Sequence, residues 1–179
     1  LNASHQGLAH WGRLLGMTYG HEAAADADIS TWVRAYLERE ALPRLLPVPG
    51  IDLTEYVDTL FERFTNAAIA DTLERLAFFG PSGMPKFVVP TVRDNLTVGG
   101  SIRLGAAMCA AWSLGVLGTD ENGERIPRVD DLRPGTRPRS SPTRRSSAIW
   151  RATSASAPPT SRSSRHCALR GLVLACAHS

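Results

Sequence analysis

An asparagine and a histidine stand three positions apart near the start of the chain, at Asn2 and His5. At that spacing, two side chains share one face of a helix. An amide can donate a hydrogen bond to an oxygen on which negative charge develops, and an imidazole can orient a hydroxyl group or relay its proton. The simpler alternative is that Asn2 caps a helix and His5 lies on its surface. Spacing alone leaves both interpretations open.

The elements that would position these two residues are amphipathic helices. Apolar side chains recur every three or four residues through most of the first 117 positions, and no segment before residue 125 shows the alternation of a strand. The predicted helices cover residues 4–16, 28–43, 52–64, 66–79, 87–96 and 102–117. We therefore predict an all-α fold, an irregular multi-helix bundle.

Polar residues and helix breakers indicate where these helices begin and end. Asp28, Asp52 and Asn66 are the predicted N-caps, and Glu55 stands three residues after Asp52 as in a capping box. The run GPSGMP at 80–85 is expected to end the fourth helix.

The remaining aromatic, histidine and cysteine residues are assigned to packing rather than chemistry. An aromatic stripe on the helices is predicted to be core: Trp32, Tyr36, Tyr56, Phe61 and Phe64. His10 and His21 are each isolated in the sequence and are assigned to a helix surface or the core. The three cysteines have no metal-ligand or disulfide spacing. We expect no metal site and a reducing, cytoplasmic location.

Charge divides the chain into two parts. All 17 acidic residues lie within residues 1–131, whereas residues 132–179 carry nine arginines and no acid. We predict a helical domain over 1–130 and a low-complexity, disordered Arg/Ser-rich tail over 131–179. The tail has one aromatic residue for base stacking and no regular basic repeat, which argues against nucleic-acid binding. A GC-rich gene read one base out of phase would give this composition, so we consider a frameshift as its origin.

The start of the chain and its hydropathy bear on its location. No apolar run approaches the length of a membrane span. The sequence begins at Leu1 without a methionine or the basic and apolar regions of a signal peptide. We expect an N-terminally truncated protein without a membrane partner.

An ordered series of motifs resembles one known family. The motifs are LNASH at the start, HE at 21–22, DADISTWVRAYLERE at 26–40, PVPGIDLTEYVDTLFERFTNAAIADTLERLA at 47–77 and PKFVVPTVRDNL at 85–96. Over roughly residues 1–130 the chain resembles the C-terminal domain of the mannitol dehydrogenase family, the polyol-specific long-chain dehydrogenases and reductases.

The resemblance implies one half of a two-domain enzyme. A Rossmann domain, absent from this chain, would bind NAD or NADP, and the helical domain would close over a polyol or sugar acid. Asn2 would hold the reacting oxygen, and His5 would bind a substrate hydroxyl. The family's general-base lysine lies five residues before the asparagine, a position that precedes Leu1. The chain is therefore expected to be inactive alone.

Two further residues are implied to bind substrate. Arg75 matches a family arginine that reaches the substrate; its simpler role is a solvated ion pair with Asp71, four residues earlier. Lys86 is the second candidate, with a plain surface lysine as its alternative.

The chain departs from the family near Lys86. The family pattern Asp-Gly-Ser-x-Lys-x-Pro is replaced by residues that put Phe79, Pro81 and Gly83 at the Asp, Ser and Lys positions. This change makes the rim of the pocket more apolar and leaves the identity of the substrate open. A different class of function, a non-catalytic helical interaction or binding module, is the alternative to an enzyme domain.

Overall fold

The computed structural model describes residues 1–118 and residue 125, and over them the chain forms helices and no sheet. The α-helices are α1 (Asn2–Leu14), α2 (Gly20–Ala25), α3 (Ala27–Tyr36), α4 (Leu53–Phe64), α5 (Leu73–Phe78), α6 (Gly80–Gly83), α7 (Val89–Thr97) and α8 (Arg103–Leu117). Two π-helical turns, η1 (Leu37–Ala41) and η4 (Met84–Val88), and two 3₁₀ turns, η2 (Leu42–Arg44) and η3 (Ala67–Ile69), connect them. The all-α prediction is confirmed.

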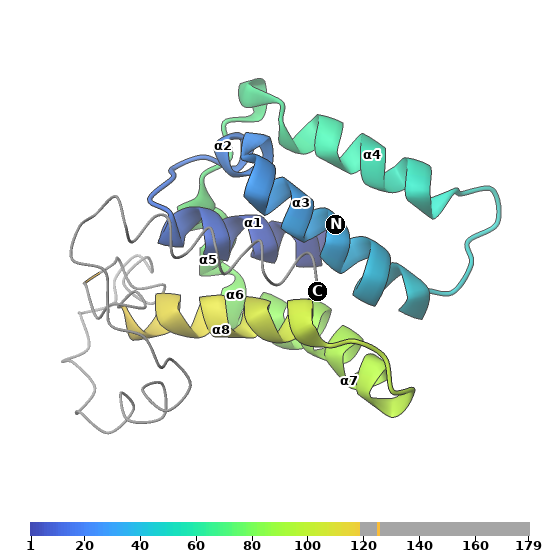
Figure 1. The fold of residues 1–179 in the computed structure, drawn as a ribbon. Helices are drawn as coiled ribbons and strands as arrows, with labels where there is room; N and C mark the ends of the chain where they lie inside the picture. The colour runs from blue at the N-terminus through green and yellow to red at the C-terminus, as the bar shows by residue number, and fades with distance from the viewer. Residues whose placement is uncertain (119–124, 126–179) are drawn as a thin grey trace.

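Helix α1 lies at the centre of the bundle and packs against α2, α3, α5 and α8 (Figure 1). Two glycines on α1 permit this close approach. A Cβ at Gly12 would lie 2.6 Å from Leu73 Cδ1, and one at Gly7 would lie 3.1 Å from the Trp32 ring. The central helix therefore holds His5 on a rigid element, because every face of its middle turns is packed.

Helix α8 is held by a carboxylate from a distant part of the chain. Glu40, in η1, is completely buried. Its Oε1 accepts hydrogen bonds from Ser101 Oγ at 2.8 Å and from the Leu104 amide at 2.9 Å, and its Oε2 accepts one from the Gly105 amide at 2.8 Å. These amides belong to the first turn of α8, so Glu40 satisfies donors that the helix itself leaves free.

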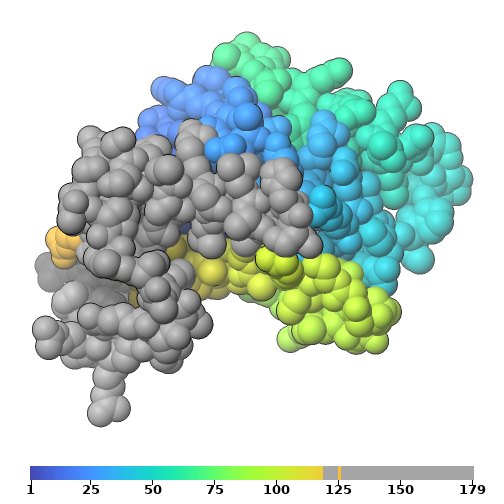
Figure 2. Space-filling view, in the orientation of Figure 1, coloured from blue at the N-terminus to red at the C-terminus, as the bar shows by residue number. Residues whose placement is uncertain are grey.

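Helix α4 lies at the periphery of the bundle. Of its twelve residues only Val57, Leu60 and Phe61 are buried. The connection that leads into it, residues 45–52, is exposed along its length, and Leu46 is 85% exposed. In Figure 2 the segment from η2 to α4 forms an outer edge of the molecule.

The predicted N-caps are right at one helix and wrong at another. Asp52 caps α4 by accepting from the Thr54 and Glu55 amides, as predicted. At α3 the cap is Asp26 instead of Asp28, because the Asp26 carboxylate accepts from the Asp28 and Ile29 amides. The helix therefore starts two residues earlier than the apolar stripe indicates.

The single helix predicted over 66–79 is wrong. Asn66 caps only the short turn η3, and Ala70 adopts a left-handed conformation with φ 49°. A second helix, α5, then begins with Thr72 as its cap. The break has a tertiary cause, since Gly20 donates its amide to the Asp71 carbonyl and Leu73 donates its amide to the Thr18 carbonyl.

The run at 80–85 does not end helical structure as predicted. It forms α6 and the start of η4, with Pro81 and Pro85 each in the first turn of their element, where a missing amide is not needed. Tyr56, assigned to the core, is 38% exposed, whereas Trp32, Tyr36 and Phe61 are buried. The predicted tail, 131–179, lies outside the described residues.

Candidate active site

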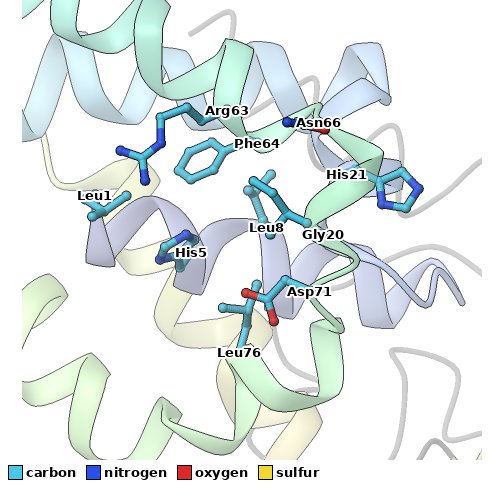
Figure 3. A pocket seen from close by; sticks show the side chains of 11 residues that line it. Leu1, His5, Leu8, Gly20, His21, Arg63, Phe64, Asn66, Asp71 and Leu76 are labelled. Carbon is cyan, nitrogen blue, oxygen red and sulfur yellow. The ribbon is translucent and has the colours of Figure 1, made fainter.

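A pocket of about 200 Å³ opens between the first half of α1, the start of α2, the end of α4 and the segment from η3 to α5. Figure 3 shows His5 and Leu8 of α1 facing Arg63 and Phe64 of α4. Asp71 and Leu76 lie on the side of His5 and Leu8 that is away from α4. Its lining is Leu1, His5, Leu8, Gly20, His21, Arg63, Phe64, Asn66, Ile69, Asp71 and Leu76. The pocket thus combines an apolar wall with a few polar groups, as small-molecule sites commonly do.

His5 is the histidine of this pocket that the sequence singled out. It is half-buried, and its ring lies tilted against Phe64 with 5.0 Å between the centroids. Burial lowers the pKa of His5 below its usual value; Arg75 and Arg63 lower it further, and the Asp71 carboxylate raises it. At neutral pH His5 is therefore an uncharged imidazole, which can accept a hydrogen bond at one nitrogen and donate one at the other.

An ion pair borders the pocket next to His5. The Arg75 guanidinium donates from Nε to Asp71 Oδ1 at 2.5 Å and from Nη2 to Asp71 Oδ2. Hydrogen bonding to Asp71 raises the pKa of Arg75. The structure thus shows the i, i+4 pair that was the simpler role for Arg75, and it also places that pair at the pocket, because Asp71 is part of the lining.

The other two predicted site residues lie outside the lining. Asn2 is exposed in the first turn of α1, three residues before His5. Its neighbour Leu1 occupies the N-cap position, so Asn2 is not the cap. Lys86 is exposed in η4, where its ammonium lies 5.3 Å from the centre of the Phe87 ring.

Four polar residues of the pocket were not predicted as site residues. One is His21, at the start of α2, which the sequence assigned to a helix surface or the core. Arg63 and Asn66 come from the end of α4 and the turn after it, and Asp71 was considered only as a partner of Arg75. The run from 62 to 71 carries these last three groups on both sides of a helix break. The one signal in the sequence was the clustering of polar residues at the end of a helix. It did not indicate that these residues lie close to His5.

His10, on the same helix, is a core residue rather than a second site histidine. It is 1% exposed, and its Nε2 lies 3.2 Å from Gln6 Oε1, an acceptor that assigns the proton to Nε2. Nδ1 is buried without a hydrogen-bond partner in the described part of the chain. Burial lowers the pKa of His10 to about 3, with a smaller contribution from Arg13.

This low pKa predicts acid sensitivity. The unfolded chain binds the proton at the ordinary pKa of 6.5, so the stabilisation by neutral His10 is complete above pH 6.5 and is lost as the pH falls toward 3. Between pH 7 and pH 5 this group should lower the free energy of unfolding by about 2 kcal/mol. Denaturant unfolding at both pH values should show a smaller loss for His10→Gln than for the parent chain. Equal losses of unfolding free energy in the two proteins would contradict the assignment of His10 as an uncharged core residue.

Comparison with known proteins places this helical unit in a family. A model of the mannitol dehydrogenase C-terminal domain matches residues 1–155. The chain belongs to the mannitol dehydrogenase family, as a C-terminal domain. The match extends past residue 130, the domain boundary predicted from composition; that boundary stays a prediction.

Individual relatives agree with this placement. The chain is 43% identical to a Pseudomonas fluorescens mannitol 2-dehydrogenase solved with NAD and D-mannitol, with a TM-score of 0.67 over 74% of this chain and 28% of that one. A D-sorbitol dehydrogenase structure is 27% identical, also with a TM-score of 0.67, over 75% of this chain and 28% of that one. Mannitol dehydrogenase 2 of Saccharomyces cerevisiae is 36% identical over 75% of this chain and 27% of its own. The chain spans about a quarter of the length of these relatives.

Over residues 1–118 the elements are helices, and the strand–helix–strand unit that cradles a dinucleotide pyrophosphate is not among them. Within residues 1–118 no helix is long and apolar enough to cross a membrane.

Proposed function

We propose that this chain is the substrate-binding domain of an NAD- or NADP-dependent oxidoreductase that interconverts a sugar alcohol of the mannitol or arabinitol type, or a related sugar acid, and its keto form. The observation that carries the proposal is the pocket in which His5 lies beside the Asp71–Arg75 pair. The relative that is 43% identical was solved with D-mannitol bound.

The residues of the pocket suit a polyhydroxylated ligand. Neutral His5 can donate to one hydroxyl of the substrate and accept from another. The carbon side of the substrate can lie on apolar lining residues such as Phe64 and Leu76, which lie on different sides of the pocket. Arg75, held in place by Asp71, has one further nitrogen, Nη1, with which to reach a substrate oxygen.

Asn2 and Lys86 complete the proposed site from outside the pocket. Asn2, one turn before His5 on α1, would donate its amide to the reacting oxygen as negative charge develops there. Lys86 would contact the far end of the substrate. Oxidation of the carbinol carbon removes a hydride, which a nicotinamide accepts, and a proton, which needs a base.

Activity assays of two proteins test this function. The 179-residue chain should be inactive alone, because its described elements lack the strand–helix–strand unit that cradles a dinucleotide pyrophosphate. The same chain fused behind the preceding part of the Pseudomonas fluorescens mannitol 2-dehydrogenase should reduce NAD with mannitol, arabinitol or a sugar acid, followed by nicotinamide absorbance. A folded fusion that turns over none of these substrates would overturn the proposal and favour a non-catalytic helical module.

A further inference from the structure

One wall of the pocket belongs to a helix at the periphery of the bundle. Helix α4 contributes Arg63 and Phe64 to the lining, and Phe64 touches the His5 ring. Yet only three of its residues are buried, and the connection before it is exposed. Figure 1 shows α4 at the edge of the bundle, away from α8. The position of this wall therefore depends on few contacts.

A single arginine of α3 supplies two of those contacts. Arg34 Nη1 donates to Asp58 Oδ1 of α4 at 2.7 Å. The same guanidinium lies over the ring of Phe61, with 4.7 Å from Cζ to the ring centre. A second carboxylate, Glu38, lies 3.7 Å from Arg34 Nη1, but it belongs to the same segment as Arg34 and does not reach α4. The Asp58 and Phe61 contacts join two helices, whereas the Glu38 contact does not.

The two α4 residues that Arg34 contacts lie close to the pocket wall along the helix. Asp58 and Phe61 are three residues apart on one face, and Phe61 packs edge-on against Phe64 with 6.0 Å between the ring centres. Phe64 in turn meets His5. A continuous series of ring and charge contacts thus runs from Arg34 to the pocket.

We propose that Arg34 is a positioning residue of the pocket, which fixes the rotation of α4 through Asp58 and Phe61 and so sets where Phe64 and Arg63 face His5. A planar guanidinium suits this role, because it can donate to a carboxylate and stack on a ring at once, which a lysine ammonium does not reproduce. The Arg34 side chain is 36% exposed and that of Asp58 62% exposed. An ion pair as exposed as this one contributes little to global stability. We therefore expect its main effect on the orientation of α4.

The test uses the full 179-residue chain and three variants. Asp58→Asn removes the contact between the helices, Arg34→Lys keeps the charge but loses the stacking geometry, and Glu38→Gln removes a carboxylate of the same cluster without touching α4. Nuclear magnetic resonance measures the His5 pKa and the contact between the His5 and Phe64 rings. Thermal unfolding measures global stability.

The first two variants should weaken the ring contact and raise the His5 pKa. The direction follows because a displaced α4 removes both burial and the nearby positive charge of Arg63, each of which lowers that pKa. Glu38→Gln should leave both readouts as in the parent chain, and all three variants should unfold close to the parent temperature. The proposal is wrong if His5 is unchanged in Asp58→Asn and Arg34→Lys, or if Glu38→Gln alters it equally.

The consequence for substrate rests on the proposed function. In the fusion enzyme, Asp58→Asn should raise KM by about tenfold while changing kcat less, since misplaced binding groups weaken substrate positioning. An inactive fusion would sink the proposed function and leave the His5 result intact. An active fusion with unchanged His5 readouts would sink the positioning role alone.

Discussion

Replacement of Glu40 by alanine is expected to lower the free energy of unfolding by about 3 kcal/mol or more. The loss has a specific origin. The Leu104 and Gly105 amides in the first turn of α8 and the Ser101 hydroxyl all donate to this completely buried carboxylate. Without it, the two amides stay buried and unpaired, and each unpaired donor costs about 1–3 kcal/mol.

Denaturant unfolding followed by circular dichroism measures this effect. Ser101→Ala is the graded control, because it removes one donor and leaves both backbone bonds; its expected cost is about 1 kcal/mol. Glu40→Gln should fall between the two, since an amide keeps one acceptor oxygen while its NH₂ group faces a donor. An unfolding midpoint for Glu40→Ala equal to that of the parent chain would contradict the capping role.

Glu40 also shows what the sequence could not reveal about the fold. In the run LERE it has the spacing of a solvated helix face, and its partners lie 61 to 65 residues later. Local periodicity describes only neighbours within a few turns. A carboxylate that caps a distant helix gives no local pattern, so its burial could not be predicted.

The helices themselves were largely predictable, because most bury one apolar stripe. One error occurs where tertiary hydrogen bonds override local preference. The chain from 66 to 79 has helical periodicity throughout, but the bonds of Asp71 and Leu73 to the 18–20 segment impose a break. At 80–85 the opposite happens: glycines and prolines suggest a loop, yet proline is accepted in the first turn of each short helix.

Of the site residues predicted from the sequence, His5 lies in the pocket lining and Arg75 lies beside it, and their roles stay predictions. His5 was found from its residue type, its spacing to Asn2 and the family resemblance, and the structure places it in the pocket. The facing wall comes from α4 and the turn after it, about 60 residues later, and no sequence pattern indicates that Arg63 and Phe64 approach His5. Their meeting follows from the way α2, α3 and α4 pack around α1, which is a property of the whole bundle.

The largest effect on catalysis is expected at His5. In the fusion enzyme, His5→Ala should lower kcat/KM by a factor of about 10² to 10⁴, the range typical for a group that handles a substrate proton or hydroxyl. His5 is suited to this role because it is uncharged at neutral pH and stands between the Phe64 wall and the Asp71–Arg75 pair.

Three further variants distinguish a chemical role of His5 from a role in packing. Asn2→Ala should lower kcat more than it raises KM, by about 10² to 10³, because a donor to a developing oxyanion acts mainly in the transition state. Glu38→Gln, remote from both, should keep the parent rate. His5→Asn preserves a donor and an acceptor and should recover part of the loss at His5. Full activity of a folded His5→Ala fusion would exclude His5 from the reaction, because a group that binds the reacting portion of the substrate cannot be removed without a loss in kcat/KM.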